Sequence, residues 1–266
     1  MFTSMDFDDE KYRAPALSKG LDILELLAGV QNGLSQAEIA KALGRTSSEI
    51  FRMLMVLRNR GYLDLAEDAD RYTLTARLFE IAHRHPPINR LTSLASDAME
   101  RLAYRINQSL HLNILHEAKT LVIAQMDSHD STQTCVRLGA RFPLASAASG
   151  RVLVAWMPEP ELSVILDRAG FDTPEALHQF RAELEEVRQV GYCQLPSGTV
   201  AGVQKIAAPI FDFRGRVVAA LTIPFVQRLA RQQAASLEEA RHALVDTCTK
   251  ISRQMGGGAH QPVSEP

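Results

Sequence analysis

The chain of 266 residues is long enough for two domains, and its 46% hydrophobic and 23% charged residues predict a packed globular core. No apolar stretch reaches the roughly 18 residues of a membrane-spanning helix, and the polar start lacks the apolar segment of a secretory signal. Three widely separated cysteines without metal-ligand spacing argue against a disulfide framework and favour a reducing compartment. We therefore expect a cytoplasmic protein with no metal, no cofactor and no membrane contact.

The formal net charge of −2 conceals an uneven distribution of charge. Residues 11–62 hold eight Lys or Arg and four Asp or Glu, a local balance of +4, so the rest of the chain is acidic. This asymmetry is typical of a small basic module joined to an acidic domain, although a solvated helix face gives the same signal.

The first elements are predicted from apolar spacing and from capping residues. Polar, aperiodic residues 1–13 predict a disordered tail. Apolar residues three to four positions apart then predict a helix that starts at Pro15 and ends near Gly29. Ser35 and Glu38 have the spacing of a capping box, which predicts a short second helix.

A third helix and a hairpin complete the first module. Gly44 predicts a tight turn, and a helix over 47–60 follows it and stops at Gly61. Two extended runs, 62–65 and 71–74, flank a polar turn and predict a hairpin. Three helices and a hairpin predict a winged helix-turn-helix over 14–75, with the helix-turn-helix itself at about 35–54.

The pattern changes in the second part of the chain. A linker helix is expected over 76–90, where Pro86-Pro87 separates the two domains. The remaining pattern predicts an α+β domain over 91–255 and a loose tail over 256–266. Its expected strands are 110–115, 120–127, 133–138, 204–212 and 216–224, and its expected helices are 89–107, 149–157, 160–168, one starting at Thr173, and 233–255.

The third helix has the two faces of a DNA recognition helix. Ile50, Leu54 and Leu57 form an apolar stripe, while Ser48 and Arg52 share the opposite, polar stripe. Arg52 is the best candidate for a bidentate contact with guanine, worth about 1–3 kcal/mol of discrimination. A module that binds another protein remains the alternative. The expected DNA contacts are Gln36, Arg45, Thr46, Ser47, Ser48, Glu49, Arg52 and, in the wing, Arg71.

Several motifs together resemble the isocitrate-lyase-regulator (IclR) family of transcription factors. They are ALSKGLDILELL at 16–27, GLS at 33–35, EIA at 38–40, RGYL at 60–63, YTLT at 72–75, VRLG at 136–139, ASGR at 148–151 and IAAPIFD at 206–212. They occur in the family's order from about residue 14 to 255. The resemblance implies a GAF-like α/β effector-binding domain and a homodimer or homotetramer on a double-stranded DNA operator.

The resemblance also implies a small-molecule effector site in the second domain. Gln204-Lys205 stands where relatives often have Arg-Cys, and 193–197 lacks the acidic run of many relatives. A partly buried lysine needs a counter-charge, so we expect a small organic or aromatic carboxylate held by Lys205 and by Ser149 or nearby amides. In the alternative, Lys205 points to solvent. The implied effector residues are Thr134, Val136, Ala148, Ser149, Leu195, Lys205, Thr222 and Pro224.

Two other functional classes remain to be weighed. A hydrolase is disfavoured because the chain has no Gly-x-Ser-x-Gly, no phosphate-binding glycine motif and no His-Glu-x-x-His motif. His111 and His116 lie on opposite faces of a predicted strand and make poor joint metal ligands. A regulator that binds DNA constitutively and uses its second domain only to dimerise is the third possibility.

Overall fold

The computed structural model describes residues 14–66, 70–84, 86–130, 134–227 and 235–257. The chain divides into two compact units, residues 1–86 and 87–266, which are treated separately below. The tail expected at 1–13 lies outside the described residues.

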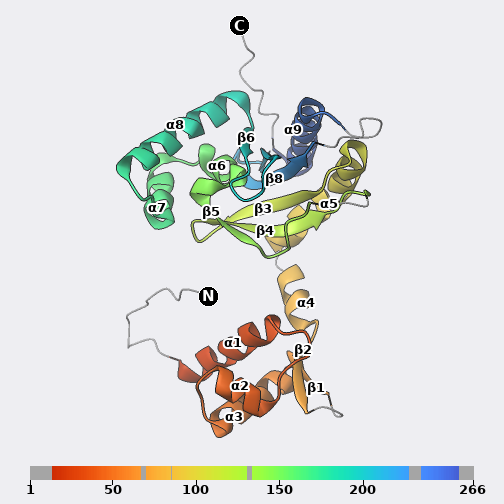
Figure 1. Ribbon diagram of the computed structural model, residues 1–266, viewed down its shortest axis with the longest axis vertical. Coiled ribbons are helices and arrows are strands. Elements are labelled where there is room, and N and C mark those ends of the chain that lie inside the picture. Colours follow the sequence, from red (N-terminus) through yellow and green to blue (C-terminus); the bar gives the residue numbers. More distant parts are fainter. Residues whose placement is uncertain (1–13, 67–69, 85, 131–133, 228–234, 258–266) are drawn as a thin grey trace. The chain divides into compact units, whose positions relative to one another are not determined.

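The first unit is the expected winged helix-turn-helix (Figure 1). Ile23, Ile39, Ile50 and Leu54 are fully buried between its three helices, and the wing's Tyr72 joins this core. The unit contains α1 (Pro15–Ala28), α2 (Gln36–Ala42), α3 (Ser47–Asn59), the antiparallel strands β1 (Leu63–Ala66) and β2 (Arg71–Leu74), and α4 (Arg77–His83).

Local contacts fix the start of α2. The Ser35 backbone N–H donates to the Glu38 carboxylate at 2.8 Å, and the Ser35 hydroxyl accepts from the Glu38 N–H, so the predicted capping box is present. Gly33 precedes it at φ +62, and a Cβ there would lie 2.5 Å from the Tyr72 carbonyl oxygen. Only glycine therefore lets the wing approach this turn so closely.

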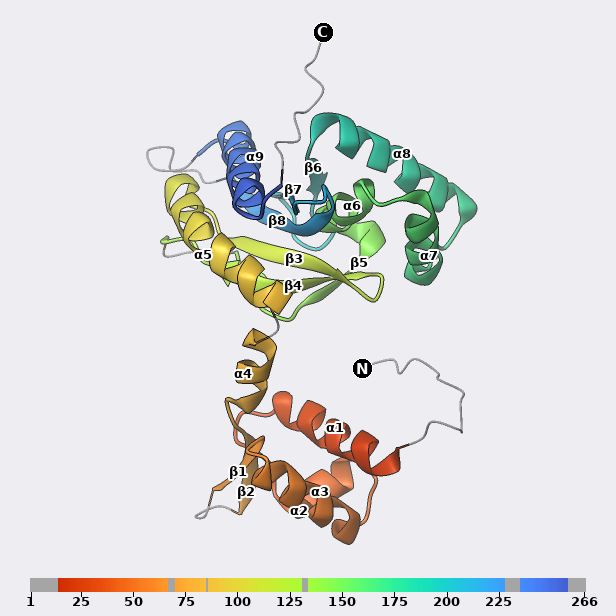
Figure 2. The ribbon, with the colours of Figure 1, turned by 180° about the vertical axis from the view of Figure 1, so that it is seen from behind.

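The second unit is a six-stranded antiparallel sheet covered on both faces by helices (Figures 1 and 2). The strand order is β5-β4-β3-β8-β7-β6. The strands are β3 (Leu110–His116), β4 (Lys119–Met126), β5 (Arg141–Pro143), β6 (Cys193–Pro196), β7 (Val203–Phe211) and β8 (Val217–Val226).

The two faces of this sheet have separate cores. Helices α5 (Pro86–Ile106) and α9 (Leu237–Gln254) pack on Leu112, Ile206 and Leu221. The other core joins Ala207 and Ala220 to the second set of helices. That set is α6 (Ala148–Ala155), entered through the 3-10 turn η2 (Leu144–Ser146), together with α7 (Glu159–Ala169) and α8 (Pro174–Val190).

The strand expected at 133–138 is absent: residue 133 is not described, and residues 134–138 form no strand. Gly139, at φ +78, turns the chain, and the segment after this turn pairs with β4 as β5. Residues 134–138 instead approach β4 through single contacts, such as the Leu138 N–H donating to the Gln125 side chain at 3.1 Å. Strand β6 was not predicted as a strand, because four residues ending in proline carry a weak periodic signal.

Two further boundaries differ from expectation. Pro86 begins α5, where the first turn needs no N–H from proline, so both prolines belong to the first turn of this helix. At the other end, Gly256 pairs with Asp212 and the Gly257 N–H donates to the Ser252 carbonyl at 2.7 Å. These two glycines therefore belong to the folded unit, and the rest of the expected tail, 258–266, lies outside the described residues.

Candidate functional site

The recognition helix α3 has the predicted division of faces. Ile50, Leu54 and Leu57 are buried in the core of the first unit. Ser48 and Arg52 are exposed on the opposite side of the helix. In the part of the chain that the structure describes, the guanidinium groups of Arg45 and Arg52 have no hydrogen-bond or ion-pair partner. The exposed face therefore presents two uncommitted cations beside small hydroxyl side chains.

Glu49, one of the predicted DNA contacts, makes hydrogen bonds within the first unit. Its carboxylate accepts hydrogen bonds from the Lys19 ammonium at 2.6 Å, the Thr46 backbone N–H at 3.2 Å and the Thr46 hydroxyl at 2.9 Å. The Lys19 hydrogen bond, followed by those from Thr46, lowers the pKa of Glu49 to about 2. Glu49 thus fixes the start of α3 against α1 and has little capacity left for a base.

Gln36 and Arg71 also make contacts within the first unit. The Gln36 side-chain amide donates to the Ser47 carbonyl at 2.9 Å, which joins α2 to the start of α3. The Arg71 guanidinium donates to the Gly33 carbonyl at 2.8 Å and pairs with Glu38 at 3.1 Å. Of the predicted DNA-contacting residues, Arg45, Thr46, Ser47, Ser48 and Arg52 form the exposed group.

The second unit contains a cavity of about 540 Å³ on the α6 side of the sheet. This volume lies within the usual range of small-molecule sites. Of the predicted effector residues, all but one line the cavity, namely Thr134, Val136, Ala148, Ser149, Lys205, Thr222 and Pro224. Additional lining residues come mainly from 140–147 and from the turn 197–200.

Leu195 is the predicted residue that the cavity does not include. It pairs with Lys205 across β6 and β7, but its half-buried side chain packs against the cluster formed by α6, α7 and α8. The following turn, Ser197 to Val200, takes its place at the cavity wall. The predicted segment therefore reaches the cavity, but through the turn after β6 and not through Leu195. Strand alternation alone does not show where β6 ends.

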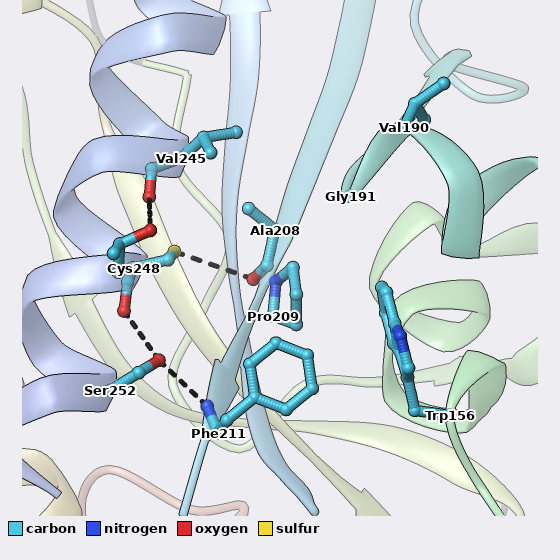
Figure 3. Close-up of a pocket in the computed structure, with 10 residues that line it drawn as sticks. Trp156, Val190, Gly191, Ala208, Pro209, Phe211, Val245, Cys248 and Ser252 are labelled. Carbon is cyan, nitrogen blue, oxygen red and sulfur yellow. Dashed lines mark hydrogen bonds between the residues drawn. The ribbon is translucent and has the colours of Figure 1, made fainter. Parts of the chain in front are cut away.

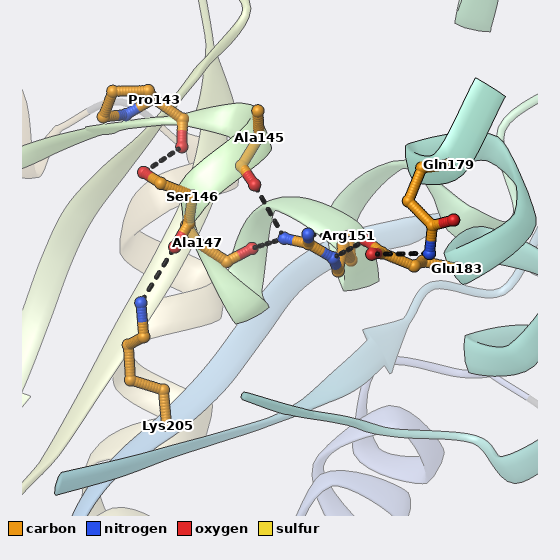
Figure 4. Close-up of polar contacts among 8 residues, drawn as sticks. All are labelled: Pro143, Ala145, Ser146, Ala147, Arg151, Gln179, Glu183 and Lys205. Carbon is orange, nitrogen blue, oxygen red and sulfur yellow. Dashed lines mark hydrogen bonds and ion pairs between the residues drawn. The ribbon is translucent and has the colours of Figure 1, made fainter. Parts of the chain in front are cut away.

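Lys205 points toward the cavity wall and not away from the protein (Figure 4). Its ammonium donates to the Ser146 carbonyl at 2.8 Å. Partial burial, and then the nearby charge of Arg151, lower the pKa of Lys205 below its usual value. Lys205 therefore lies on an inner strand of the sheet, half-buried, with its ammonium bound to η2.

Arg151 holds the segment that Lys205 touches. The guanidinium, 8% exposed as a residue, donates to the Ala145 carbonyl at 2.9 Å and to the Glu183 carboxylate of α8 at 2.7 Å (Figure 4). Gly150 beside it permits the close approach, since a Cβ there would overlap the Leu144 carbonyl oxygen. The ASGR motif thus frames the cavity wall, with glycine and arginine in structural roles.

His111 is a lining residue that the sequence analysis did not assign to the site. It is 5% exposed, and burial lowers its pKa to about 4, so the imidazole is neutral near pH 7. Its Nδ1 is buried without a hydrogen-bond partner. The available signal was the alternation in β3, where His111 and Asn113 are polar on the face opposite Leu110 and Leu112.

The charge of the cavity is one-sided. Arg137 and Lys205 line it, and no Asp or Glu does so among the residues that the structure covers. Cys135 is exposed at the cavity, whereas Cys193 is buried.

A second cavity, of about 40 Å³, lies between β7, α9 and Trp156 (Figure 3). Phe211 meets Trp156 edge to face at 5.3 Å, and Ser252 links the Phe211 N–H to α9. Such a space holds no more than a few waters. Within the described ranges, there is no cluster of three or more potential metal ligands, and none of the helices is long and apolar enough to cross a bilayer.

Comparison with known families identifies both units. Residues 16–65 match the IclR helix-turn-helix domain, and residues 88–253 match the C-terminal domain of the bacterial transcriptional regulator IclR. The chain belongs to the IclR family. The resemblance inferred from the motifs is thereby confirmed, and this IclR-family protein is a DNA-binding transcriptional regulator and not an enzyme.

Individual relatives agree with this assignment. The HTH-type transcriptional regulator KdgR of Escherichia coli (strain K12) is 29% identical over 94% of this chain and 96% of its own. The glycerol operon regulatory protein of Streptomyces coelicolor is 29% identical over 91% of this chain and 97% of its own.

Solved structures confirm the fold class. The IclR of Thermotoga maritima has a TM-score of 0.72 at 26% identity and covers 90% of this chain and 98% of its own. An IclR homologue from Microbacterium hydrocarbonoxydans, solved with 4-hydroxybenzoate, has a TM-score of 0.75 at 24% identity with the same coverage.

Proposed function

We propose that this IclR-family regulator binds its operator through the exposed face of α3 and that a small organic carboxylate in the C-terminal cavity controls the binding. The observation that carries the effector assignment is the one-sided charge of the cavity, with Lys205 at its wall and no described carboxylate lining it. An apolar cavity with a few convergent polar groups is the usual form of a small-molecule site.

The start of α6 supplies a second anion-binding feature. Its N-cap, Ala147, has no side-chain cap, and Ala147, Ala148 and Ser149 line the cavity. The first amides of a helix lack intrahelical acceptors and favour negative charge. A carboxylate placed between this helix start and Lys205 satisfies both. The 4-hydroxybenzoate of the Microbacterium homologue supports an aromatic member of this class.

In the DNA-binding half of the proposal, Arg52 contacts a base edge, and Arg45, Thr46, Ser47 and Ser48 contact bases or phosphates. Glu49 and Gln36 hold the start of α3 in place for these contacts. The family's regulators imply a homodimer or homotetramer, so two copies of α3 meet the two halves of a pseudo-palindrome.

Binding of genomic fragments tests the operator half. Fragments captured by the full-length protein are used in fluorescence anisotropy titrations of wild type, Arg52→Ala and Arg58→Ala. We expect Arg52→Ala to weaken operator binding about 10- to 100-fold, as the loss of a bidentate base contact in each half-site predicts. Arg58 lies in the last turn of the same helix, away from the Ser48–Arg52 stripe, and serves as the matched control. Equal weak binding of operator and random DNA would refute this half.

Calorimetric titration with carboxylates tests the effector half. Lys205→Met is expected to weaken carboxylate binding about tenfold or more, because a charge-assisted hydrogen bond is lost. Lys119→Met removes an exposed lysine of the same unit and should leave affinity unchanged. If no carboxylate binds the wild type or shifts its melting temperature, the constitutive regulator with a structural second domain becomes the better assignment.

A further inference from the structure

The cavity has a second group of polar lining residues, on the two central strands β3 and β8. His111 and Thr222 are cross-strand partners on β3 and β8, and both line the cavity. Asn113, buried beside them, donates to the Thr222 hydroxyl at 3.0 Å. That bond leaves the proton of the Thr222 hydroxyl uncommitted. The floor of the cavity is therefore polar but uncharged.

His111 Nδ1 and Asn113 Oδ1 are both buried without a hydrogen-bond partner, and of these two residues it is His111 that lines the cavity. A buried polar atom without a partner has given up its hydrogen bonds to water without replacing them, and native proteins leave few such atoms. His111 is more than nine-tenths buried and lines the cavity, so a molecule in the cavity can supply the missing partner. A neutral imidazole has one donor and one acceptor nitrogen. A hydroxyl both donates and accepts, so it satisfies Nδ1 in either tautomer.

The sheet register separates His111 from Lys205. Lys205 of β7 pairs with Pro224 of β8. Thr222, two residues before Pro224 on β8, pairs with His111 of β3. Two strand spacings and two residues along the strand give roughly 12 Å between the Cα positions of Lys205 and His111. The proposed carboxylate position between Lys205 and the start of α6 uses the charged group of the ligand, so a separate, neutral substituent is needed to reach Nδ1.

We propose that His111 is a specificity-determining residue that hydrogen-bonds a hydroxyl at the far end of the effector, so the effector class is a carboxylate with a distal hydroxyl group. This inference rests on the carboxylate site of the proposed function and adds the second substituent. If a permanently bound water occupied the Nδ1 site instead, the affinity would not depend on whether the ligand carries the hydroxyl.

The test compares matched ligands on full-length wild type, His111→Phe and His111→Asn by calorimetry. The probes are benzoate, 4-methylbenzoate and 4-hydroxybenzoate, with butyrate and 4-hydroxybutyrate as the aliphatic pair. In wild type, we expect a hydroxylated probe to bind about five- to tenfold more tightly than its partner without the hydroxyl. His111→Phe keeps the ring shape and should reduce this preference to within about twofold. His111→Asn places an amide near the position of Nδ1 and should restore it.

Nitrogen NMR of ¹⁵N-histidine-labelled protein gives an independent readout. The Nδ1 resonance of His111 should shift with the hydroxylated probe and not with 4-methylbenzoate, which a purely structural histidine would not do. A wild-type protein that binds both members of a pair equally, or an unchanged preference in folded His111→Phe, overturns the inference and leaves the carboxylate site standing. If no probe binds wild type, the carboxylate site itself fails, and the inference fails with it.

Discussion

The cations of the two units are used in opposite ways. Arg45, in the turn before α3, and Arg52, on α3, are exposed and have no partner among the described residues, so the proposed contact with DNA would displace only water. At the cavity, Lys205 and Arg151 already donate to the carbonyls of Ser146 and Ala145. A ligand that binds the Lys205 ammonium must share or replace the hydrogen bond from this ammonium to the Ser146 carbonyl of η2. The DNA surface is thus a preformed surface, whereas the effector cavity is held by contacts that a ligand can exchange.

This difference suggests where a signal starts. Differential affinity of a ligand for two arrangements of the protein is what shifts an equilibrium between them. The segment 144–147 touches Lys205 on one side and Arg151, with Glu183 behind it, on the other. We expect this segment to differ most between the free and the ligand-bound second unit, which hydrogen exchange can measure.

The largest predicted effect concerns the buried arginine. Arg151→Met leaves the partly buried Glu183 carboxylate without its cation and the Ala145 carbonyl without its donor, so the second unit should lose about 3–5 kcal/mol of unfolding free energy. Arg52→Met, on the exposed surface, should change the stability of the first unit by less than about 0.5 kcal/mol. Urea denaturation of both variants provides the comparison. Equal losses would show that the two classes of arginine do not differ as described.

The second effect is a pH dependence of the stability of the second unit, caused by His111 in the cavity. The pKa of His111 is about 4 in the folded protein and near 6.5 when unfolded, so the unfolded state binds its proton first. The stabilisation by His111 is complete above pH 6.5 and is lost as the pH falls toward 4, by up to roughly 3 kcal/mol. Denaturation of wild type and His111→Phe between pH 7 and 4 isolates this contribution. Parallel curves for the two proteins would contradict the buried neutral histidine.

The third effect compares a glycine in each unit. Gly150→Ala places a Cβ against the Leu144 carbonyl and should cost the second unit about 1–3 kcal/mol. Gly20, in the middle of α1, has no atom within 4 Å of a built Cβ, so Gly20→Ala should stabilise the first unit by about 0.5–1 kcal/mol. Melting temperatures report both. If Gly150→Ala left the melting temperature unchanged, η2 would have to move to make room for the Cβ. The cavity wall would then be deformable without a ligand.

The smallest effect concerns Glu49. Because its carboxylate is committed to Lys19 and Thr46, Glu49→Gln should loosen the start of α3 slightly and weaken operator binding without changing base preference. A changed preference at one operator position, measured by competition among single-base variants, would restore Glu49 to the base-reading group. Serine at the exposed position 48 is the matched site, where Ser48→Ala tests a contact with DNA directly.

The sequence alone determined the local features of this protein. The capping box at Ser35 and Glu38, the Thr173 cap followed by Pro174, and the buried stripe of α3 depend on residues within one or two helical turns of each other. The family motifs identified the class of protein, and these short-range patterns located its recognition helix. Most of the cavity residues also followed from the resemblance, because the family keeps the order of these segments.

The tertiary structure decided whatever depends on residues distant in sequence. The Glu49 carboxylate binds the ammonium of Lys19, thirty positions away in the sequence. The Lys205 ammonium donates to the carbonyl of Ser146, which is on a different element. The strand expected at 133–138 did not form among the described residues, where Gly139 turns the chain with a positive φ. Leu195 packs against the helices on its side of the sheet. His111 entered the cavity through its pairing with Thr222 on a distant strand. Sequence periodicity tells which face of a strand a side chain occupies, but only packing tells what that face meets.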